Sequence, residues 1–377
     1  MKILYVTTIS LTMNSFFKPH IAMLVREGHH VDIACNDKDL ALDPLYGELG
    51  CGFYRIEFSR SPLSSDNVKA YGQLKKVIEN GEYDVVHCHT PNASVITRLV
   101  CESFRKKTGL KVFYTAHGFH FYKGAPKLNW MVYYPVEKFC SRFTDKLIMI
   151  NREDYELAKN KFKAKEVHYV PGVGIDLSRF ENVQIDKAEK RKEIGVPEES
   201  FLLLSVGELN ENKNHQIIIR ALAKLNDPNV HYAIAGEGDK KEYLLSLANE
   251  LGVSEQVHLL GYRKDIPELN HAADVFCFPS LREGLGLAAI EAMACGIPAV
   301  VADNRGTRSF VSDGQNGYIC ESGSADGFAA AVGALMNDPQ LKKALSEKAC
   351  NTTARFSEEA VLKEMKKIYA DCKMTYA

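Results

Sequence analysis

The sequence predicts an α/β fold in which two Rossmann-like domains face each other across a cleft. Short apolar, β-branched runs alternate with longer stretches of helical periodicity along most of the 377 residues, and this alternation is typical of doubly wound parallel sheets. Most runs are apolar at nearly every position, as expected for parallel strands that are buried on both faces. The alternation restarts near residue 200, beyond a break at Pro171-Gly172-Val173-Gly174, so we expect a second sheet.

The first half of the chain supplies the strands of one predicted sheet and the helices between them. The strand candidates are Ile3–Thr7, Val31–Cys35, Val85–His89, Val112–Thr115, Lys146–Ile150 and Val167–Val170. Helical periodicity covers residues 15–27, 67–80, 93–107, 128–142 and 153–161. No small-residue cleavage site follows the opening apolar run, so we interpret that run as a strand and not as a signal peptide.

The second half repeats the pattern with its own strands and helices. The strand candidates are Phe201–Val206, Val230–Ala235, Val257–Leu260, Val275–Pro279, Ala299–Ala302 and Gly317–Cys320. Helical periodicity covers residues 213–225, 239–251, 286–295, 325–336, 338–353 and 357–373. In open parallel sheets, ligands bind beyond the carboxyl ends of the strands, so candidate site residues are sought just after each strand.

The charge balance argues against a general nucleic-acid binder, because 47 basic residues oppose 48 acidic ones and the net charge is −1. The halves differ: residues 1–170 hold 24 basic and 18 acidic residues, and the remainder holds 23 and 30. A basic first half is compatible with contact to an anionic membrane surface. No uncharged apolar stretch reaches the roughly 18 residues of a membrane span, so such contact would be peripheral. The ten cysteines include no CxxC pair, which favours reduced thiols.

The densest group of candidate site residues follows the predicted strand Val275–Pro279. A glycine-rich turn leads into a helix near Gly286, and the unpaired N–H groups and the dipole of a helix start favour an anion. Gly284 and Gly286 lack a Cβ, so a phosphate can approach the backbone closely. Glu283 precedes the helix and Glu291 lies about one turn into it, where carboxylates can bind sugar hydroxyls. The alternative is that both carboxylates only complement the helix dipole.

Two further turns follow strands of the second half. Gly207 opens the first turn, and Lys213 is expected at the start of the next helix, where a cation needs a nearby anion or exposure to water. A diphosphate would supply that anion, and a solvated lysine is the alternative. Gly236 opens the second turn in a Gly-x-Gly sequence, which is also common in ordinary tight turns. Neither a GxGxxG fingerprint nor a Walker A loop occurs, although the looser GxGxxA form spans Gly284 to Ala289.

Histidines gather after the strands of the first half. His117 follows the run Tyr114-Thr115-Ala116 and is expected to project into the cleft from a strand end. His87 and His89 stand two residues apart on one predicted strand, so their side chains can share a face and bind a metal. No third or fourth ligand follows at a suitable spacing, and packed or hydrogen-bonded histidines are the alternative. We therefore expect no metal site.

Together these elements resemble the family 4 retaining glycosyltransferases, which have the GT-B fold. The main signature is the Glu-x7-Glu pair of Glu283 and Glu291. The supporting matches are Pro171 to Asp176, Gly207 to Asn214, Gly236-Glu237-Gly238, Gly261-Tyr262-Arg263, Asn304 to Thr307 and Asn316-Gly317-Tyr318. The segment Thr115 to Phe121 is most similar to bacterial capsule and exopolysaccharide members of the family.

The resemblance implies one domain for each substrate. Residues 1–172 would form an N-terminal acceptor-binding domain, and residues 173–356 a C-terminal domain that binds the nucleotide sugar. Residues 357–377 would form a helix that packs back on the first domain.

The resemblance also implies a role for each donor-side residue. Glu291 would bind the donor ribose, and Glu283 would hold hydroxyls of the donor sugar and stabilise an oxocarbenium-like transition state. Lys213 would neutralise the leaving diphosphate, together with backbone N–H groups of Gly284, Leu285 and Gly286. The lysine and the helix dipole would replace a metal ion electrostatically, so no metal or other cofactor is expected.

Further roles implied by the resemblance concern the edges of the donor site. His117 would lie near the donor sugar and contact its hydroxyls. Gly207 and Gly236 would belong to the turns that contact the donor. Backbone around Tyr262 and Arg263 would hold the base.

Two departures from the family pattern affect these expectations. Glu208 stands where the family usually has an arginine that is paired with Lys213 on the diphosphate. We expect Glu208 to point away from the donor and Arg282 to supply the missing positive charge. The Gly-Gly loop that usually follows the first strand is replaced by Thr8 to Thr12, so the acceptor contacts of that loop are open.

The predicted function is therefore retaining transfer of a hexosyl or N-acetylhexosaminyl group in surface polysaccharide synthesis. The donor would be a nucleotide sugar, with UDP favoured, and the acceptor a polyprenyl-diphosphate-linked or free saccharide. The lysines and aromatic residues of Lys123 to Tyr134 indicate peripheral contact with an anionic membrane, which would place the protein in the cytoplasm at the inner face. A solvated basic face is the alternative for this segment. A nucleotide-sugar 2-epimerase of the same fold and a non-catalytic sugar-nucleotide-binding protein are the alternative functions.

Overall fold

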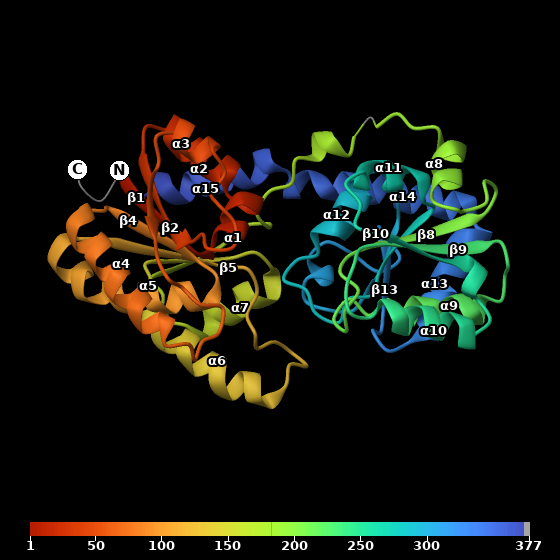
Figure 1. Cartoon of the computed structure of the whole chain (residues 1–377), viewed down its shortest axis with the longest axis horizontal. Helices are drawn as coiled ribbons and strands as arrows, with labels where there is room; N and C mark the ends of the chain where they lie inside the picture. The colour runs from red at the N-terminus through yellow and green to blue at the C-terminus, as the bar shows by residue number, and fades with distance from the viewer. Residues whose placement is uncertain (182, 373–377) are drawn as a thin grey trace. The chain divides into compact units, whose positions relative to one another are not determined.

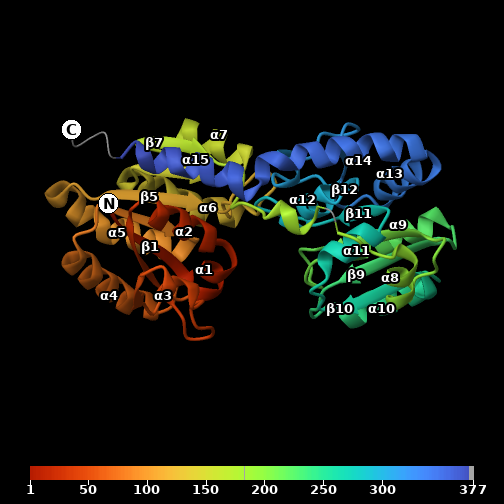
Figure 2. The same cartoon turned by 90° about the horizontal axis from the view of Figure 1, so that it is seen from above.

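The computed structural model describes residues 1–181 and 183–372, and they fold into two compact units (Figures 1 and 2). Unit 1 comprises Met1–Gly174 together with the described residues from Glu358 to Cys372, and unit 2 comprises Ile175–Ser357. The last part of the predicted C-terminal helix, residues 373–377, lies outside the described residues. The sequence placed these bounds at 172/173 and 356/357. Each unit contains one parallel sheet with helices on both faces, which confirms the predicted α/β class.

Unit 1 is built on a seven-stranded parallel sheet with the order β3-β2-β1-β4-β5-β6-β7. Its strands are β1 (Lys2–Ile9), β2 (His30–Asn36), β3 (Gly52–Arg55), β4 (Val85–His89), β5 (Lys111–Ala116), β6 (Lys146–Met149) and β7 (Glu166–Tyr169). The direction in which successive strands are added reverses between β1 and β4. Loops that leave the carboxyl ends of these two strands therefore run to opposite sides of the sheet and leave a crevice between them.

The helices of unit 1 cover both faces of its sheet (Figure 1). They are α1 (Ser10–Phe16), α2 (Lys18–Arg26), α3 (Leu45–Glu48), α4 (Asp66–Gly81), α5 (Pro91–Thr108), α6 (Lys127–Cys140), α7 (Arg152–Lys161) and α15 (Glu358–Ala370). Alternate residues of β1 point to opposite faces. Leu4 and Val6 join the core beneath α4 and α5, whereas Ile3 and Tyr5 join the core beneath α2 and α15.

Helix α15 belongs to unit 1 although unit 2 separates it from the rest of that unit in the sequence. Its Tyr369 is 2% exposed, and the Tyr369 ring centroid lies 5.3 Å from that of Phe113 on β5. The ammonium group of Lys146 donates a hydrogen bond of 2.8 Å to the backbone oxygen of Ile368. These contacts close one face of the sheet of unit 1.

Unit 2 is built on a six-stranded parallel sheet with the order β10-β9-β8-β11-β12-β13. The strands are β8 (Phe201–Val206), β9 (Val230–Ala235), β10 (Val257–Gly261), β11 (Val275–Phe278), β12 (Ala299–Ala302) and β13 (Gly317–Cys320). The helices are α8 (Lys187–Glu193), α9 (Gln216–Leu225), α10 (Lys241–Glu250), α11 (Ile266–Ala272), α12 (Leu287–Ala294), α13 (Ala325–Asn337) and α14 (Pro339–Thr353). Leu203, Tyr232 and Ile234 form the core with α9, α10 and α13. The order reverses between β8 and β11.

Every strand predicted from the sequence is present, and the differences concern short or exposed elements. Strand β3 was not predicted because its side chains from Phe53 to Arg55 are exposed, so no apolar run marks it. The single helix predicted over residues 15–27 is two helices, α1 and α2, which meet at Phe17. The helix predicted to begin at 213 begins at Gln216.

Candidate functional site

The donor-side residues predicted from the sequence gather where the strand order of unit 2 reverses. The loop that follows β8 carries Gly207 and Lys213, and the loop that follows β11 carries Glu283 and the turn into α12. Both loops leave the carboxyl edge of the sheet at neighbouring strands, which pair through Leu203 and Leu204 of β8. This is the position at which open parallel sheets bind their ligands.

Lys213 and Glu283 form an ion pair that joins these two loops. The Nζ atom of Lys213 lies 2.7 Å from Oε1 of Glu283 and 5.2 Å from the centroid of the Phe278 ring. Lys213 lies in the turn before α9, so the prediction that it occupies a helix start is wrong, because the turn extends to His215 before the helix begins. In this structure the anion that balances the lysine is Glu283.

Asn214 and His215, the two residues after Lys213, fix the loop that carries this lysine. Asn214 adopts a left-handed backbone with φ of 54°, which asparagine tolerates better than most residues, and its amide donates to the backbone oxygens of Pro279 and Ser322. His215 Nδ1 lies 3.1 Å from the hydroxyl of Tyr232. Burial lowers the pKa of His215 to about 4, so this ring is neutral near pH 7.

The turn after β11 is braced by the backbone and side chains of neighbouring loops. Asn212 Nδ2 donates to the backbone oxygen of Arg282 at 3.1 Å, and the Asn212 backbone oxygen accepts from the N–H of Leu281 at 2.8 Å. On the other side, a Cβ on Gly306 would lie 2.7 Å from the backbone oxygen of Leu285. Only a glycine lets the 306 loop approach this closely.

Helix α12 starts at this turn with a glycine as its N-cap. Gly286 is its N-cap, with φ of 108°, and as a glycine it has no side chain that could accept from the first N–H groups of the helix. A Cβ on Gly286 would lie 2.9 Å from the ring of Phe278, so glycine is required for both conformation and space. Gly284 is partly exposed in the same turn. The helix start therefore offers N–H groups and a favourable dipole to an anion.

Glu291 lies one turn into α12 and is half-buried. Burial raises the pKa of this carboxyl, and the nearby charge of Arg179 opposes the rise only in part. Glu291 is the fifth residue of an eight-residue helix, too far along to complement the positive end of its dipole. The helix-dipole explanation therefore fits Glu283, which precedes the helix, but not Glu291.

Gly207 and Gly236 have a structural explanation that needs no ligand. A Cβ on Gly236 would lie 1.9 Å from the backbone oxygen of Gly207, and the N–H of Gly236 donates to the backbone oxygen of Gly261 at 2.8 Å. A Cβ on Gly207 would lie 3.2 Å from Cε of Lys213. These glycines let the loops after β8, β9 and β10 pack together. Gly207 also leaves room for the aliphatic part of the Lys213 side chain.

Tyr262 and Arg263 follow β10 and differ in their surroundings. The Tyr262 side chain is 70% exposed. The guanidinium of Arg263 forms ion pairs of 2.5 Å with Asp265 and Glu193, which raise the pKa of Arg263 and hold its side chain on the α8 side of unit 2. The Arg263 side chain is therefore held by two carboxylates, whereas the Tyr262 side chain is open to solvent, and contact of their backbone with the base stays a prediction.

Glu208, which stands where the family usually has an arginine, is exposed to solvent. Glu208 points into solvent, and its carboxylate accepts a hydrogen bond of 2.9 Å from Asn210. It forms no described contact with Lys213. The Arg282 side chain is also exposed, one residue before Glu283.

His117 lies in unit 1, directly after β5, within a cluster of histidines. Its Nε2 is 3.3 Å from Nδ1 of His89, and burial together with the neighbouring His20 lowers the pKa of His117 to about 4. His87 is fully buried, and its Nε2 lies 2.8 Å from Oγ1 of Thr115. Within residues 1–181 and 183–372, no group of three or more His, Cys, Asp or Glu side chains is arranged to hold a metal ion.

Comparison with known proteins identifies the family. The model for "Glycosyl transferases group 1" matches residues 186–352, and the model for "Glycosyl transferase 4-like" matches residues 2–151. EpsD of Bacillus subtilis (strain 168), a glycosyltransferase by name, is 40% identical over 373 residues, which span 98% of this chain and 96% of EpsD. The chain belongs to the family 4 glycosyltransferases.

Two further comparisons place the transferase among proteins of the same architecture. The UDP-Gal:alpha-D-GlcNAc-diphosphoundecaprenol alpha-1,3-galactosyltransferase of Escherichia coli is 27% identical over 328 residues, which span 85% of the transferase and 83% of that enzyme. The crystal structure of Anabaena HepE in complex with UDP and glucose superimposes with a TM-score of 0.79 at 20% identity and covers 98% and 100% of the two chains. This likeness establishes the GT-B fold.

The structure adds residues to the site of the transferase that the sequence did not single out. Asn212 and Asn214 shape the lysine loop, and Arg179 sets part of the field at Glu291. The asparagines recur at every second position from 210 to 214, which is a signal of a hydrogen-bonded turn. Arg179 carries no such signal, because its approach to α12 depends on the path of the chain between the two units.

Proposed function

We propose that the transferase moves a hexosyl or N-acetylhexosaminyl group from a UDP-sugar, with retention at the anomeric carbon, to a lipid-linked or saccharide acceptor in surface polysaccharide synthesis. The observation that carries this proposal is the position of the Lys213–Glu283 pair beside the open N-terminus of α12. UDP is supported by the UDP named with HepE and by the UDP-Gal named for the Escherichia coli relative. The lipid-linked acceptor is supported by the diphosphoundecaprenol in that same name.

Donor binding would exchange one partner of Lys213 for another. The diphosphate would receive the ammonium of Lys213 and the backbone N–H groups of Gly284, Leu285 and Gly286. Glu283, released from the lysine, would face the hydroxyls of the donor sugar. A diphosphate carries more charge than one carboxylate, so the lysine gains electrostatic energy in this exchange.

For the remaining groups of the donor, we keep the roles that the family resemblance implies. Glu291 would accept hydrogen bonds from the ribose hydroxyls, and the backbone at Tyr262 and Arg263 would contact the base. We assign His117 to the hydroxyls of the donor sugar, since a ring with a pKa near 4 is neutral at pH 7 and can both donate and accept.

The proposed reaction takes place on one face of the sugar. The bond from the anomeric carbon to the phosphate oxygen breaks, the acceptor oxygen bonds to that carbon from the same side, and its proton passes to the departing phosphate oxygen. A double displacement would need a second carboxylate about 5 Å from Glu283. Within the described part of unit 2, the group that the structure places against Glu283 is the ammonium of Lys213. Lys213 and α12 would stabilise the leaving group in place of a metal ion.

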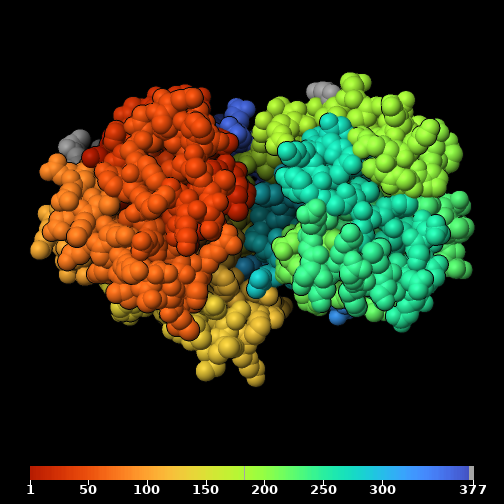
Figure 3. Space-filling model, in the orientation of Figure 1, coloured from red at the N-terminus to blue at the C-terminus, as the bar shows by residue number. Residues whose placement is uncertain are grey.

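We also propose that α6 rests on an anionic membrane at the cytoplasmic face. Its outer side carries an apolar row at helical spacing, Leu128, Met131, Val132, Val136 and Phe139, with Met131 73% and Leu128 67% exposed. The exposed cations around this row are Lys123, Lys127, Lys138 and Arg142. Helix α6 forms a ridge on the surface of unit 1, drawn in yellow (Figure 3). Basic amphipathic helices of this kind bind membrane interfaces.

The aromatic residues of this segment face the other way. Trp130, Tyr133 and Tyr134 pack against the core of unit 1, and the indole N–H of Trp130 donates to the backbone oxygen of Tyr122. Because these aromatics are partly buried, the proposal assigns the main interfacial contact to the more exposed aliphatic row. No helix within residues 1–181 and 183–372 combines the length and apolar character of a membrane span.

A donor and acceptor panel tests the proposed function. UDP- and GDP-sugars are combined with polyprenyl-diphosphate saccharides, and nucleotide release and the anomeric configuration of the product are measured. We expect acceptor-dependent release of UDP, an α-linked product from an α-linked donor, and full activity with a chelator present. Glu291→Gln should abolish turnover, whereas Glu255→Gln, an exposed control on the same unit, should not.

The panel also distinguishes the alternatives. An epimerised sugar formed without acceptor would indicate a 2-epimerase, and donor binding without any nucleotide release would indicate a non-catalytic binder. Activity lost to a chelator and restored by manganese would contradict the metal-independent mechanism.

A further inference from the structure

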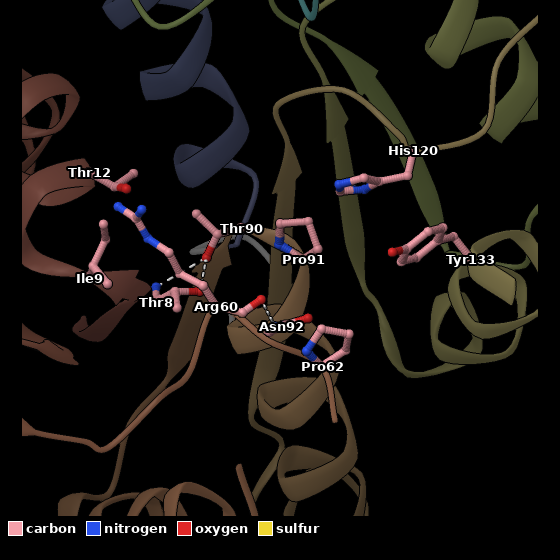
Figure 4. A pocket seen from close by; sticks show the side chains of 10 residues that line it. All are labelled: Thr8, Ile9, Thr12, Arg60, Pro62, Thr90, Pro91, Asn92, His120 and Tyr133. Carbon is pink, nitrogen blue, oxygen red and sulfur yellow. Dashed lines mark hydrogen bonds between the residues drawn. The ribbon is translucent and has the colours of Figure 1, made fainter. Parts of the chain in front are cut away.

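A second ligand pocket lies in unit 1, at the point where the strand order of its own sheet reverses. The pocket holds about 240 Å³ and is lined by residues at and after the carboxyl ends of β1 and β4, including Thr8, Thr12 and Thr90, together with Arg60, His120 and Tyr133 (Figure 4). The carboxyl ends of β1 and β4 flank the reversal, as the ends of β8 and β11 do in unit 2. The rule that places ligands at this crevice therefore applies to this pocket too.

The floor of the pocket is a pair of threonines in a strained arrangement. Thr90 has φ of 66°, a conformation that β-branched residues rarely adopt because Cβ crowds the backbone. Its hydroxyl lies 2.7 Å from the hydroxyl of Thr8 and accepts from the N–H of Thr8 at 3.1 Å. These bonds hold the ends of β1 and β4 together, and the next residue, Pro91, begins α5.

The only ionic side chain on the pocket wall is a cation. Arg60 is exposed, and none of the ten lining residues is acidic. Asn92 of α5 fixes the Arg60 loop, since its amide donates to the backbone oxygens of Ser59 and Arg60 at 3.0 and 2.7 Å. The Arg60 side chain extends toward Thr12 (Figure 4). A guanidinium beside hydroxyl groups and a helix N-terminus is suited to a phosphate.

The opposite wall is suited to a sugar ring. The rings of His120 and Tyr133 are stacked with centroids 4.7 Å apart, and the Tyr133 hydroxyl points toward the pocket (Figure 4). Asn129, also on α6, donates to the backbone oxygen of His120 at 2.9 Å and fixes this pair. The aromatic edges and the threonine hydroxyls offer both apolar and hydrogen-bonding contact, as a saccharide requires.

Helix α6 connects this pocket to the apolar row described above. Tyr133 points inward from α6 to the pocket, whereas Met131 and Val132, its immediate neighbours, are on the exposed side. A ligand whose head group lies against Tyr133 is therefore within one helix diameter, about 10 Å, of the surface on which a lipid chain would lie. Neither a free sugar nor a free phosphate would make use of this adjacency.

We propose that the pocket binds the glycosyl phosphate head group of a lipid acceptor, with the phosphate at Arg60 and the sugar against Tyr133. This assignment rests on the proposed glycosyltransferase function and deepens it, because it names the part of the acceptor that unit 1 recognises. It also accounts for the Thr8 to Thr12 segment that replaces a Gly-Gly loop: threonine hydroxyls line the site there.

Binding of soluble head-group probes to the full chain tests the assignment. The probes are N-acetylglucosamine 1-phosphate, N-acetylglucosamine and inorganic phosphate, and the affinity is measured by calorimetry. We expect Arg60→Ala to weaken binding of the sugar phosphate at least tenfold and Arg60→Lys to weaken it less. Arg26→Ala removes the same charge from α2 of unit 1 and should change nothing. Tyr133→Leu should weaken the sugar and the sugar phosphate alike.

The same experiment separates this pocket from the donor site. UDP affinity should be unchanged in Arg60→Ala, and sugar-phosphate affinity should be unchanged in Glu291→Gln. Sugar-phosphate binding that survives Arg60→Ala and disappears in Glu291→Gln would overturn the proposal. Absence of nucleotide release in the donor panel, with Arg60-dependent probe binding intact, would instead count against the proposed function alone.

A vesicle arm identifies the source of the phosphate. N-acetylglucosamine 1-phosphate is attached through its phosphate to a prenyl chain and incorporated in vesicles of anionic lipid. We expect tighter binding than to the soluble probe, lost on Arg60→Ala and reduced when Met131 is changed to glutamate. Equal affinity for the soluble and the prenyl-linked sugar phosphate would contradict a lipid acceptor.

Discussion

The ammonium nitrogen of Lys213 lies 2.7 Å from Oε1 of Glu283, so one ion pair joins the loops that leave β8 and β11. The side chains are 23% and 16% exposed, which leaves the pair accessible to a ligand. The ammonium group of Lys213 is therefore balanced by the carboxylate of Glu283. In the proposed mechanism, binding of a diphosphate to Lys213 would free the Glu283 carboxylate for the donor sugar.

Lys213→Ala is expected to lower kcat/KM for the donor about 100-fold, because in the proposed mechanism the leaving diphosphate loses the ammonium group that neutralises it. Stability should change by no more than about 1 kcal/mol, since partly exposed ion pairs contribute little. Steady-state kinetics and calorimetry measure the two effects. Lys224→Ala on α9, where the lysine pairs with exposed Asp326, is the matched control. A loss of stability as large as the loss of activity would show that the lysine is structural.

Glu291→Gln is expected to stabilise unit 2 at neutral pH while it abolishes donor binding. The folded-state pKa of Glu291 is raised, so its protonated form favours the fold, and that contribution is lost as the pH rises through the folded pKa. At pH 7 the variant should therefore melt about 2 °C higher than the wild type, and near pH 4 the difference should vanish. Calorimetry at both pH values tests this. A lower melting temperature at pH 7 would mean that the ionised carboxylate has a stabilising partner.

Arg282→Ala is expected to reduce donor turnover more than tenfold, equivalent to about 1.4 kcal/mol. The reason is that Glu208 has turned into solvent and the exposed Arg282 is the cation next to Glu283. Arg220→Ala, an exposed arginine on α9, serves as the control. Turnover close to that of the wild type would exclude a role for Arg282 on the diphosphate.

Unit 1 is expected to lose stability in mild acid because of its histidine cluster. Burial lowers the pKa of His20, His87, His89 and His117, the last to about 4. Their contribution is complete above the unfolded pKa of about 6.5 and is lost as the pH falls toward the folded values. His117→Gln should reduce the loss between pH 6.5 and 4 by about 1–3 kcal/mol, whereas His168→Gln should not. Urea unfolding across this pH range provides the measurement, and an unchanged pH slope in His117→Gln would contradict the assignment.

Membrane binding is expected to depend on the apolar row of α6. Leu128→Glu combined with Met131→Glu places two charges where burial in the interface is proposed, so flotation with anionic vesicles should be lost. Both side chains are largely exposed, so the fold should be preserved. Val68→Glu changes an equally exposed residue of α4 and should leave flotation intact. Flotation that persists in the double variant would refute the role of α6.

The buried parallel strands could be predicted from the sequence because burial on both faces leaves an uninterrupted apolar run. Val85–His89 and Phe201–Val206 begin and end as predicted. Strand β3 and helix α8 could not be found in this way. The side chains of β3 face solvent from Phe53 onward, so they form no apolar run. Helix α8 buries Arg191 in an ion pair of 2.6 Å with Asp274, and a buried charged residue does not appear in an apolar pattern.

In the candidate site too, features within one short segment could be predicted from the sequence, whereas features that join distant segments could not. Glu283, Glu291 and the glycine turn stand in one short segment, so their spacing and resemblance to a family sufficed. The pairing of Lys213 with Glu283 joins positions 70 residues apart and depends on which strands are neighbours in the sheet. The pocket of unit 1 is harder still, because Arg60, Thr90 and Tyr133 come from three different segments and carry no shared motif.

Helix α15 determines the order in which the two units can complete their folding during translation. The face of the first sheet that carries Tyr5, Val85 and Phe113 is completed only when this helix emerges, after all of Ile175–Ser357 has been translated. At elongation rates of about 5–20 residues per second, that interval is roughly 10–40 s. During this time the apolar face of the unit 1 sheet that α15 covers remains exposed outside the ribosome. Unit 2, which is continuous in the sequence, can therefore complete its fold before unit 1 does. Chaperone demand should therefore track the speed of ribosomes over the codons of the second lobe.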